Sequence, residues 1–240
     1  MTRTRLWAGS AATVAGAAAL QVAPAGTWLP TLRRLVPRLA SPMPAGAVAL
    51  TFDDGPHPDG TPALLDALEV LGWPATFFML GAAVRRWPDV AREVVARGHA
   101  VGLHGDEHRY LLLRSPRATA ADLRRAADAL TETTGVAAAW WRPPYGVLSA
   151  AGLVAAHRQG LQPVLWTAWG RDWVPGASAE SVAWTVFESR LSGGTILLHD
   201  SDAYGADGSW RATLAALPLI AEELERRRLA VRAFPTIAEP

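Results

Sequence analysis

Cysteine is absent from this sequence, which excludes disulfide bonds and thiolate chemistry. Any metal ion would therefore have to be bound by histidine and carboxylate side chains. Lysine is absent as well, so every basic side chain is an arginine and no lysine Schiff base can form. Positive and negative side chains nearly balance at a formal net charge of +1, so the charge gives no indication of a nucleic acid partner.

The N-terminus has the pattern of an export signal. Arg3 and Arg5 precede an uncharged, alanine-rich stretch that ends in Ala23-Pro24-Ala25. A basic start, an apolar stretch and a small-residue site are typical of a secretory signal peptide. The same stretch could also stay uncleaved as a short membrane anchor. We therefore expect residues 1–25 to be a signal peptide or anchor, and the protein to be secreted or anchored at the cell envelope.

Residues 26–46 are rich in proline and arginine and predict a linker with a possible short helix. It could be a solvated connector, or its arginines could contact an anionic membrane surface.

From residue 47 to residue 240, short apolar runs alternate with helical segments, without a break in composition. The predicted strands are Val48–Phe52, Ala75–Met79, His99–Leu103, Ala139–Arg142, Pro163–Thr167, Thr195–His199 and Ala230–Ala233. The predicted helices are Pro62–Leu71, Gly81–Arg97, Thr119–Thr134, Ser149–Gln159, Ala179–Leu191 and Trp210–Arg228. This alternation predicts an α/β fold, and about seven parallel strands in one domain favour a barrel.

Ionisable side chains follow several of these strands at their carboxyl ends. Two adjacent carboxylates, Asp53 and Asp54, come directly after the first strand. By itself this pattern is also compatible with a strand that ends in an Asp-Gly turn. Further polar segments follow the later strands at His104–His108, Arg142–Gly146, Trp169–Trp173 and His199–Asp200. Parallel strands bring such residues to one edge of the sheet, where α/β folds bind their ligands.

His104 and His108 are four residues apart, so a single helical turn would present both imidazoles to one ion. Together with Asp54 they form a set of two imidazoles and one carboxylate, which suits a catalytic metal with open positions. The remaining histidines are expected elsewhere. His57 is expected in a loop, His99 in the core and His157 on the surface.

These segments resemble the ordered motifs of the polysaccharide deacetylase family, carbohydrate esterase family 4, from about Val48 to the C-terminus. The matching residues are Thr51-Phe52-Asp53-Asp54-Gly55, His104 with His108, Arg142-Pro143-Pro144-Tyr145, Asp172-Trp173 and Leu197-Leu198-His199-Asp200. The resemblance implies a distorted (β/α) barrel and a metal-dependent deacetylase that acts on an acetylated glycan.

The resemblance also implies a role for each matching residue. Asp54, His104 and His108 would bind one divalent metal ion, most commonly zinc. Asp53 would be the general base, held by Arg142, and His199 the general acid, paired with Asp172. The Tyr145 backbone N–H would help bind the oxyanion, and Leu197 and Trp173 would line the acetyl pocket.

The sequence departs from the family pattern at two of these motifs. Gly105 stands where serine or threonine is usual, and Trp169 stands where an aspartate is common. Because aromatic faces stack on sugar rings, Trp169 and Trp173 are candidates for substrate binding.

We expect a monomeric hydrolase that removes N-acetyl groups, with O-acetyl groups as the alternative. Two alternatives remain: a small-molecule N-acyl or formyl amidohydrolase on the same scaffold, and a non-catalytic glycan-binding relic. A long open groove would favour the glycan hydrolase, and a closed pocket would favour the small substrate.

Overall fold

A computed structural model of the chain describes residues 16, 18–40 and 42–235. The predicted signal or anchor at residues 1–25 therefore lies mostly outside the described residues. Within the described part, no helix has the length and apolar character needed to span a membrane.

The described residues form one eight-stranded parallel sheet that curls into a partial barrel. Its strands are β1 (Ala47–Asp53), β2 (Thr76–Leu80), β3 (Ala100–Gly105), β4 (Trp140–Trp141), β5 (Gln162–Pro163), β6 (Ala168–Trp169), β7 (Thr195–His199) and β8 (Ala230–Arg232). Seven strands follow the order β5-β4-β3-β2-β1-β7-β6, and β8 pairs with the beginning of β1. The predicted α/β fold with a distorted parallel barrel is confirmed.

The sheet is built around β1, whose seven residues are all buried. Such a strand lacks an exposed face, as expected for a central parallel strand covered on both sides. The strand pairs with β2 on one side and with β7 on the other. Its C-terminal residue Asp53 therefore lies in the middle of the sheet edge.

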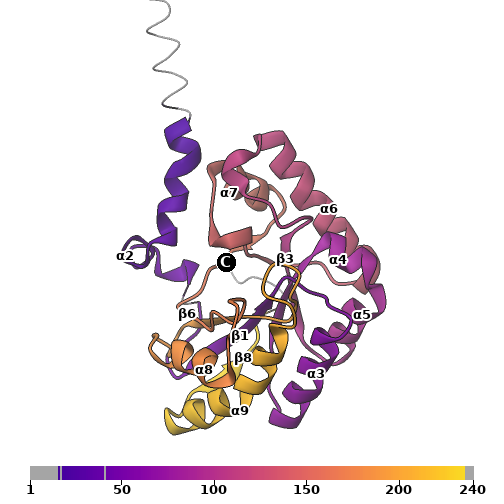
Figure 1. The fold of residues 1–240 in the computed structure, drawn as a ribbon. Coiled ribbons are helices and arrows are strands. Elements are labelled where there is room, and N and C mark those ends of the chain that lie inside the picture. The colour runs from indigo at the N-terminus through magenta and orange to yellow at the C-terminus, as the bar shows by residue number, and fades with distance from the viewer. Residues whose placement is uncertain (1–15, 17, 41, 236–240) are drawn as a thin grey trace, which may run out of the picture.

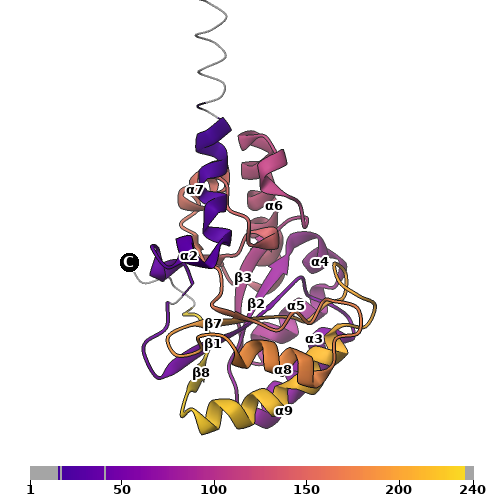
Figure 2. The same ribbon diagram turned by 60° about the vertical axis from the view of Figure 1, so that its left-hand side comes forward.

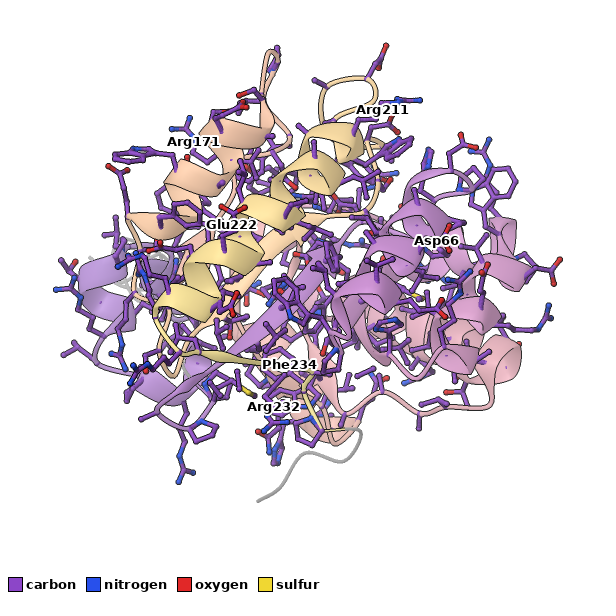
Figure 3. All side chains as sticks on the ribbon, turned by 90° about the horizontal axis from the view of Figure 1, so that it is seen from below. Asp66, Arg171, Arg211, Glu222, Arg232 and Phe234 are labelled. Atoms are coloured by element: carbon purple, nitrogen blue, oxygen red, sulfur yellow. The ribbon has the colours of Figure 1, made fainter. Side chains whose placement is uncertain are left out.

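Helices surround the strands (Figures 1 and 2). They are α3 (Gly60–Leu71), α4 (Gly81–Arg86), α5 (Pro88–Ala96), α6 (Pro116–Thr134), α7 (Ala150–Arg158), α8 (Ala179–Phe187) and α9 (Trp210–Arg226). Seen from below, α9 crosses the molecule with Glu222 and Arg211 along its length, and Arg232 and Phe234 lie beyond its C-terminal end (Figure 3). Leu217, Ile220 and Leu224 of α9 are buried, so the helix covers the core with one face.

The predicted helix Gly81–Arg97 is two helices, because Pro88 starts α5 directly after α4. Proline has no N–H to donate and its ring disfavours helical geometry in the preceding residue. Trp87, the residue before it, accordingly has the non-helical angles φ −129° and ψ 59°.

The predicted strand Pro163–Thr167 is wrong as a continuous element, because only its first residue belongs to β5 and β6 begins after its end. Between β5 and β6, Val164 and Thr167 still donate to β4 and β7, but the backbone of Leu165 bonds to groups outside the sheet. The Leu165 N–H donates to the Leu39 carbonyl at 2.6 Å, and the Leu165 carbonyl accepts from Arg142 Nη2 at 3.2 Å. Among the described residues, β5 and β6 do not pair with each other, which leaves the barrel open there.

The N-terminal segment, defined here as residues 18–40, lies beside this opening (Figure 2). It contains η1 (Ala23–Trp28), α2 (Pro30–Arg33) and η2 (Pro37–Leu39). Before η1, Gln21 Oε1 accepts a hydrogen bond from the Ala151 N–H at the start of α7. At its other end Leu39 and Ala40 are buried in the main hydrophobic core. Much of the region expected as a linker, residues 26–46, is thus in contact with the barrel.

Candidate active site

Asp54, His104 and His108 come together at the carboxyl edge of the sheet. Asp54 Oδ1 lies 3.3 Å from His104 Nε2 and 3.5 Å from His108 Nε2. One ligand atom from each of the three residues lies within 4.8 Å of the others, as a shared ion requires. The structure thus brings together the three residues that the sequence predicted as metal ligands.

The expected helical turn between the two histidines is wrong. His104 belongs to β3, and His108 lies in the loop after it. Gly105 turns the chain between them with φ +116°, in a region that residues with a Cβ rarely adopt. The positive φ at position 105 thus explains why a glycine stands there. The ring centroids of His104 and His108 are 5.1 Å apart.

The loop between His104 and His108 is held in place by charged side chains. Asp106 forms ion pairs with Arg85 at 2.8 Å and with Arg125 at 2.9 Å. The Asp106 N–H donates to Asp122 Oδ2 at 3.0 Å. These contacts hold the backbone that leads to His108, and they involve residues that sequence analysis did not single out.

The histidine tautomer can be inferred from the hydrogen bonds around His104. Its Nδ1–H donates to the Arg142 carbonyl at 2.9 Å, so its Nε2 carries a lone pair toward Asp54. Asp54 Oδ1 is buried and accepts no hydrogen bond from the described residues. Lone pairs of an imidazole and a carboxylate therefore face each other, and a divalent cation between them would satisfy both. The donor set fits such an ion.

The electrostatics of the ligands agree with metal binding. Burial opposes a charge on Asp54, but contact with His104 and the nearby His199 and His108 outweigh it and lower its pKa to about 2. Burial lowers the pKa of His108 to about 4, although Asp54 acts in the opposite direction. Near neutral pH the carboxylate is thus charged and the His108 imidazole is neutral, the forms that bind metals.

Asp53, next to Asp54, is held by the fully buried Arg142. Arg142 Nη1 donates to Asp53 Oδ1 at 2.6 Å and to Thr51 Oγ1 at 2.8 Å. Its guanidinium carbon lies 4.2 Å from the centroid of the Phe78 ring. Burying an arginine is costly unless it is paired, so Asp53 and Arg142 depend on each other. Asp53 Oδ2 stays on the pocket side, 3.8 Å from His104 Nδ1.

His199 and Asp172 form a second pair across the pocket. The His199 Nδ1 and Asp172 Oδ1 are 2.9 Å apart, and the His199 N–H donates to Asp172 Oδ2 at 2.7 Å. The Thr213 hydroxyl also donates to Asp172 Oδ2, at 2.6 Å. Burial would lower the pKa of His199, but Asp172, with help from Asp54 and Asp53, raises it to about 10. The imidazole therefore holds a proton on Nε2, which lies 3.9 Å from Asp54 Oδ2.

The ligands and both pairs surround one pocket of about 480 Å³. Trp169, Trp173 and Leu197 line it, as do the metal ligands, Asp53 and His199. The Trp173 ring meets the His199 ring edge-on at 5.2 Å. Arg142 contacts Asp53 and Asp172 contacts His199, but neither Arg142 nor Asp172 lines the pocket itself.

Tyr145 lies at the rim of the pocket, with the uncommon backbone angle φ 59°. Its ring stacks on Tyr110 at 3.9 Å and packs against His108 at 4.2 Å. The Tyr204 ring also packs against His108, with 4.3 Å between the ring centroids. The pocket thus has an aromatic rim beside a predicted metal ligand.

Six lining residues were not among the predicted site residues: Trp28, Tyr110, Gly146, Trp166, Arg171 and Tyr204. Tyr110 and Arg171 each stand close to a predicted motif, which is the only signal for them in the sequence. Trp28 lies in the segment that was expected to be a linker, and Tyr204 lies in the loop between β7 and α9.

Asp200 directly follows His199 but does not line the pocket. It is buried and accepts a hydrogen bond from the Thr61 hydroxyl at 2.5 Å. Burial, with Asp54 nearby, raises the pKa of Asp200 to about 7. The other histidines lie as expected: His57 precedes α3, His99 is buried and accepts from the Ala75 N–H, and His157 is exposed.

The family model for polysaccharide deacetylase matches residues 40–164, slightly more than half of the chain. This chain belongs to the polysaccharide deacetylase family. The match covers β1 to β5 and includes Asp53, Asp54, His104 and His108. The family resemblance seen in the sequence is thereby confirmed.

Relatives in this deacetylase family are similar over most of the chain. A chitooligosaccharide deacetylase from Sinorhizobium fredii is 36% identical over 84% of this chain and 95% of its own. A peptidoglycan-N-acetylglucosamine deacetylase from Bacillus cereus is 37% identical over 75% of this chain and 82% of its own. The solved structure of the Bc1960 peptidoglycan N-acetylglucosamine deacetylase has a TM-score of 0.76 at 29% identity and covers 83% of this chain and 91% of its own.

Proposed function

We propose that this protein is a metal-dependent hydrolase that removes N-acetyl groups from a glycan of the cell envelope or the extracellular space. Membership of the deacetylase family and the names of the relatives support a glycan deacetylase. The observation that carries the proposal is the convergence of the Asp54-His104-His108 set with the Asp53–Arg142 and His199–Asp172 pairs on one pocket.

Asp54, His104 and His108 would hold one divalent ion, with zinc the best match to two imidazoles and a carboxylate. When bound, such an ion polarises a carbonyl and lowers the pKa of a water ligand. Asp53, kept in place by Arg142, accepts the proton of the attacking water. The backbone N–H of Tyr145 donates to the developing oxyanion.

His199 donates its Nε2 proton to the leaving amine, which a deacetylation of an amide requires. Asp172 keeps that proton on the imidazole and fixes the ring through Nδ1. Acid and base thus approach the scissile amide from different strands. Leu197 and Trp173 would enclose the acetyl group, and Trp169 would stack on a sugar ring.

An extended substrate is favoured over a small N-acyl or formyl compound because the pocket adjoins a second cavity. A second cleft of about 700 Å³ shares Trp28, Trp166 and Trp169 with it. A glycan chain could continue along these rings, whereas a small substrate would need a closed cavity. The presence of every predicted ligand, base and acid argues against a non-catalytic relic. The export pattern at residues 1–25 supports action outside the cytoplasm.

The test is mass spectrometry of N-acetylated chitin oligomers and of peptidoglycan fragments after incubation with zinc-loaded protein. The expected product has lost acetyl groups, and the Asp53→Asn variant should give far less of it. Intact glycans together with rapid hydrolysis of small N-acyl or formyl compounds would favour the small-substrate alternative. Intact substrates of every class would point to a relic.

A further inference from the structure

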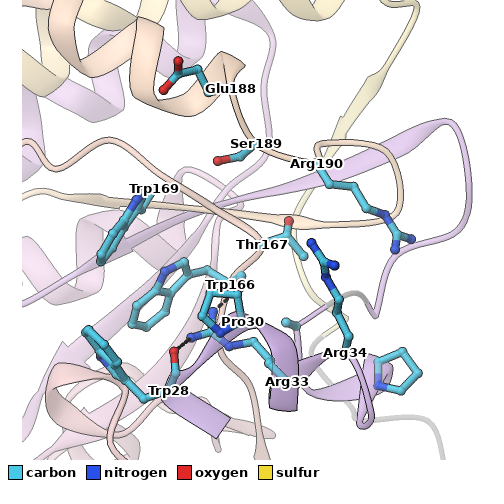
Figure 4. Close-up of a pocket in the computed structure, with 12 residues that line it drawn as sticks. Trp28, Pro30, Arg33, Arg34, Trp166, Thr167, Trp169, Glu188, Ser189 and Arg190 are labelled. Atoms are coloured by element: carbon cyan, nitrogen blue, oxygen red, sulfur yellow. Dashed lines mark hydrogen bonds between the residues drawn. The ribbon is translucent and has the colours of Figure 1, made fainter.

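The second cleft beside the pocket is walled partly by the N-terminal segment (Figure 4). Trp28 of this segment and Trp166 and Trp169 of the barrel line both cavities, so the cavities adjoin at these rings. Trp166 and Trp169 are 6.1 Å apart and stacked, with 26° between their planes. Trp166 is buried, whereas Trp28 is 46% exposed and Trp169 is partly exposed, so these two rings offer faces on which sugar rings can stack.

Arg33 holds the segment together and fastens it to the barrel. Its Nη1 donates to the Trp166 carbonyl at 2.6 Å, and its Nη2 and Nε donate to the Trp28 and Thr27 carbonyls at 2.8 and 2.9 Å. The guanidinium carbon also lies 5.2 Å from the centroid of the Trp166 ring. Burial, and then the charge of Arg142, lower the pKa of Arg33. Arg33 is therefore a structural clamp, since each of its three nitrogens donates to a backbone carbonyl.

Two other arginines of the cleft are free to bind a ligand. Arg34 and Arg190 are both exposed and both line it. Figure 4 shows their guanidinium groups at the same end of the cleft, beyond Thr167, with Glu188 at the opposite end. Within the described part of the chain neither arginine has a carboxylate partner, and Arg190 donates only to the Ser192 carbonyl at 3.4 Å.

We propose that Arg34 and Arg190 form a subsite for an acidic unit of the glycan, a sugar that bears a carboxylate. The planar guanidinium fork matches a carboxylate with two parallel hydrogen bonds. A chain deacetylated at the proposed metal ligands would pass over Trp169 and Trp28, which line both cavities, and its acidic sugar would reach the two arginines. This inference rests on the proposed function, because it concerns the binding of the same substrate at a sugar away from the one that is deacetylated.

The test compares two sets of glycan oligomers of equal length. One set is neutral chitin oligomers, and the other alternates N-acetylglucosamine with a sugar that carries a lactyl carboxylate. The variants are Arg34→Gln, Arg190→Gln and the double variant. Arg38→Gln is the matched control, since Arg38 is an exposed arginine of the same segment that does not line the cleft.

We expect the double variant to raise KM for the acidic oligomers about fivefold or more, since exposed charge pairs contribute up to about a kcal/mol each. KM for chitin oligomers and kcat for both sets should stay unchanged, and Arg38→Gln should behave as the parent protein. Added salt should reduce the preference for acidic oligomers in the parent and leave the double variant unaffected.

Equal KM changes for neutral and acidic oligomers, or no change for either, would overturn the assignment. If the parent protein deacetylates neither set, the proposed function fails instead. The subsite is then tested by titration calorimetry of the same oligomers with the same variants. Binding of acidic oligomers that is unaffected in the double variant would refute the subsite independently of catalysis.

Discussion

Asp53 and His199 are register partners on the neighbouring strands β1 and β7. Adjacent strands in a sheet are about 4.8 Å apart, so the backbone itself fixes the distance between these two positions. The proposed base and acid thus depend on a hydrogen-bonded ladder and not on a flexible loop. Each is then aimed by a buried partner, Arg142 for Asp53 and Asp172 for His199.

The two adjacent carboxylates should separate metal binding from proton transfer. Asp54→Asn removes a ligand, so both bound zinc and activity should be lost. Asp53→Asn keeps the ligand set, so zinc should remain while kcat falls about 10²–10⁴-fold, the usual contribution of a general base. Elemental analysis beside turnover measurements checks both. Equal zinc content in the two variants would show that the roles are assigned wrongly, and full activity after chelation would exclude the metal.

The His199–Asp172 pair should control the alkaline limb of the pH–rate profile. His199 acts while protonated, and Asp172 raises its pKa to about 10 although burial acts in the opposite direction. Activity should therefore persist at mildly alkaline pH and fall as His199 loses its proton. Asp172→Asn removes the main raising influence, so the fall should move to lower pH. The measurement is kcat against pH.

Thr213→Val is the matched control for this pair, because it removes a hydrogen bond to Asp172 but keeps the carboxylate charge. Its alkaline limb should stay close to that of the parent. His199→Ala should lower kcat about 10²–10⁴-fold with zinc still bound. The double variant of His199 and Asp172 should lose little more than His199→Ala alone. Fully multiplicative losses would mean that the two residues act independently.

Asp200 should make the folded protein less stable as pH rises. Burial raises its pKa to about 7, above the ordinary value of 3.8, so the folded state holds this proton more tightly than the unfolded state does. Stability from this group is complete below pH 4 and is lost as pH increases toward 7, by at most about 1.4 kcal/mol per pH unit. Asp200→Asn should remove that decline.

Urea unfolding of the parent and of Asp200→Asn at several pH values between 4 and 8 measures this effect. Asp59→Asn is a suitable control, because Asp59 is an exposed aspartate directly before α3. Parallel stability curves for the parent and Asp200→Asn would show that Asp200 does not titrate in this range.

Arg33 should hold the Trp28 wall of the pocket. Arg33→Gln removes the donors that bind the Thr27, Trp28 and Trp166 carbonyls. Hydrogen exchange in residues 18–40 should accelerate, and KM for long glycans should increase while kcat for the shortest substrates stays similar. Leu35→Ala, at a side chain that is 77% exposed, should change neither the hydrogen exchange rate nor the KM for long glycans. Unchanged exchange in Arg33→Gln would mean that other contacts hold the segment.

Sequence reasoning located the site because its residues follow strand ends. Parallel strands collect such positions at one edge, so Asp53, His104 and His199 could be placed together before their contacts were known. The spacing of His104 and His108 was less informative, since it is the same in a helix and in a strand followed by a turn. Only the positive φ of Gly105 distinguishes the two arrangements.

The wall formed by the N-terminal segment could not be predicted from the sequence. Its hydrogen bonds to the barrel are from Arg33 Nη1 to the Trp166 carbonyl, from the Leu165 N–H to the Leu39 carbonyl and from the Ala151 N–H to Gln21 Oε1, so two of the three acceptors are backbone carbonyls. Backbone acceptors exist at every position and leave no pattern in the side chains. The same contacts interrupt the strand predicted at Pro163–Thr167, where apolar residues would otherwise favour a continuous strand.

The shallow attachment of the N-terminal segment has a consequence for the temperature range of the enzyme. Neither η1 nor α2 buries a side chain, whereas the barrel has a large continuous core. Segments with few buried apolar contacts open locally at a much smaller free energy than global unfolding requires. On warming, the wall at Trp28 should detach while the barrel is still folded. Processing of extended glycans should therefore decline below the melting temperature of the protein, and the loss should reverse on cooling.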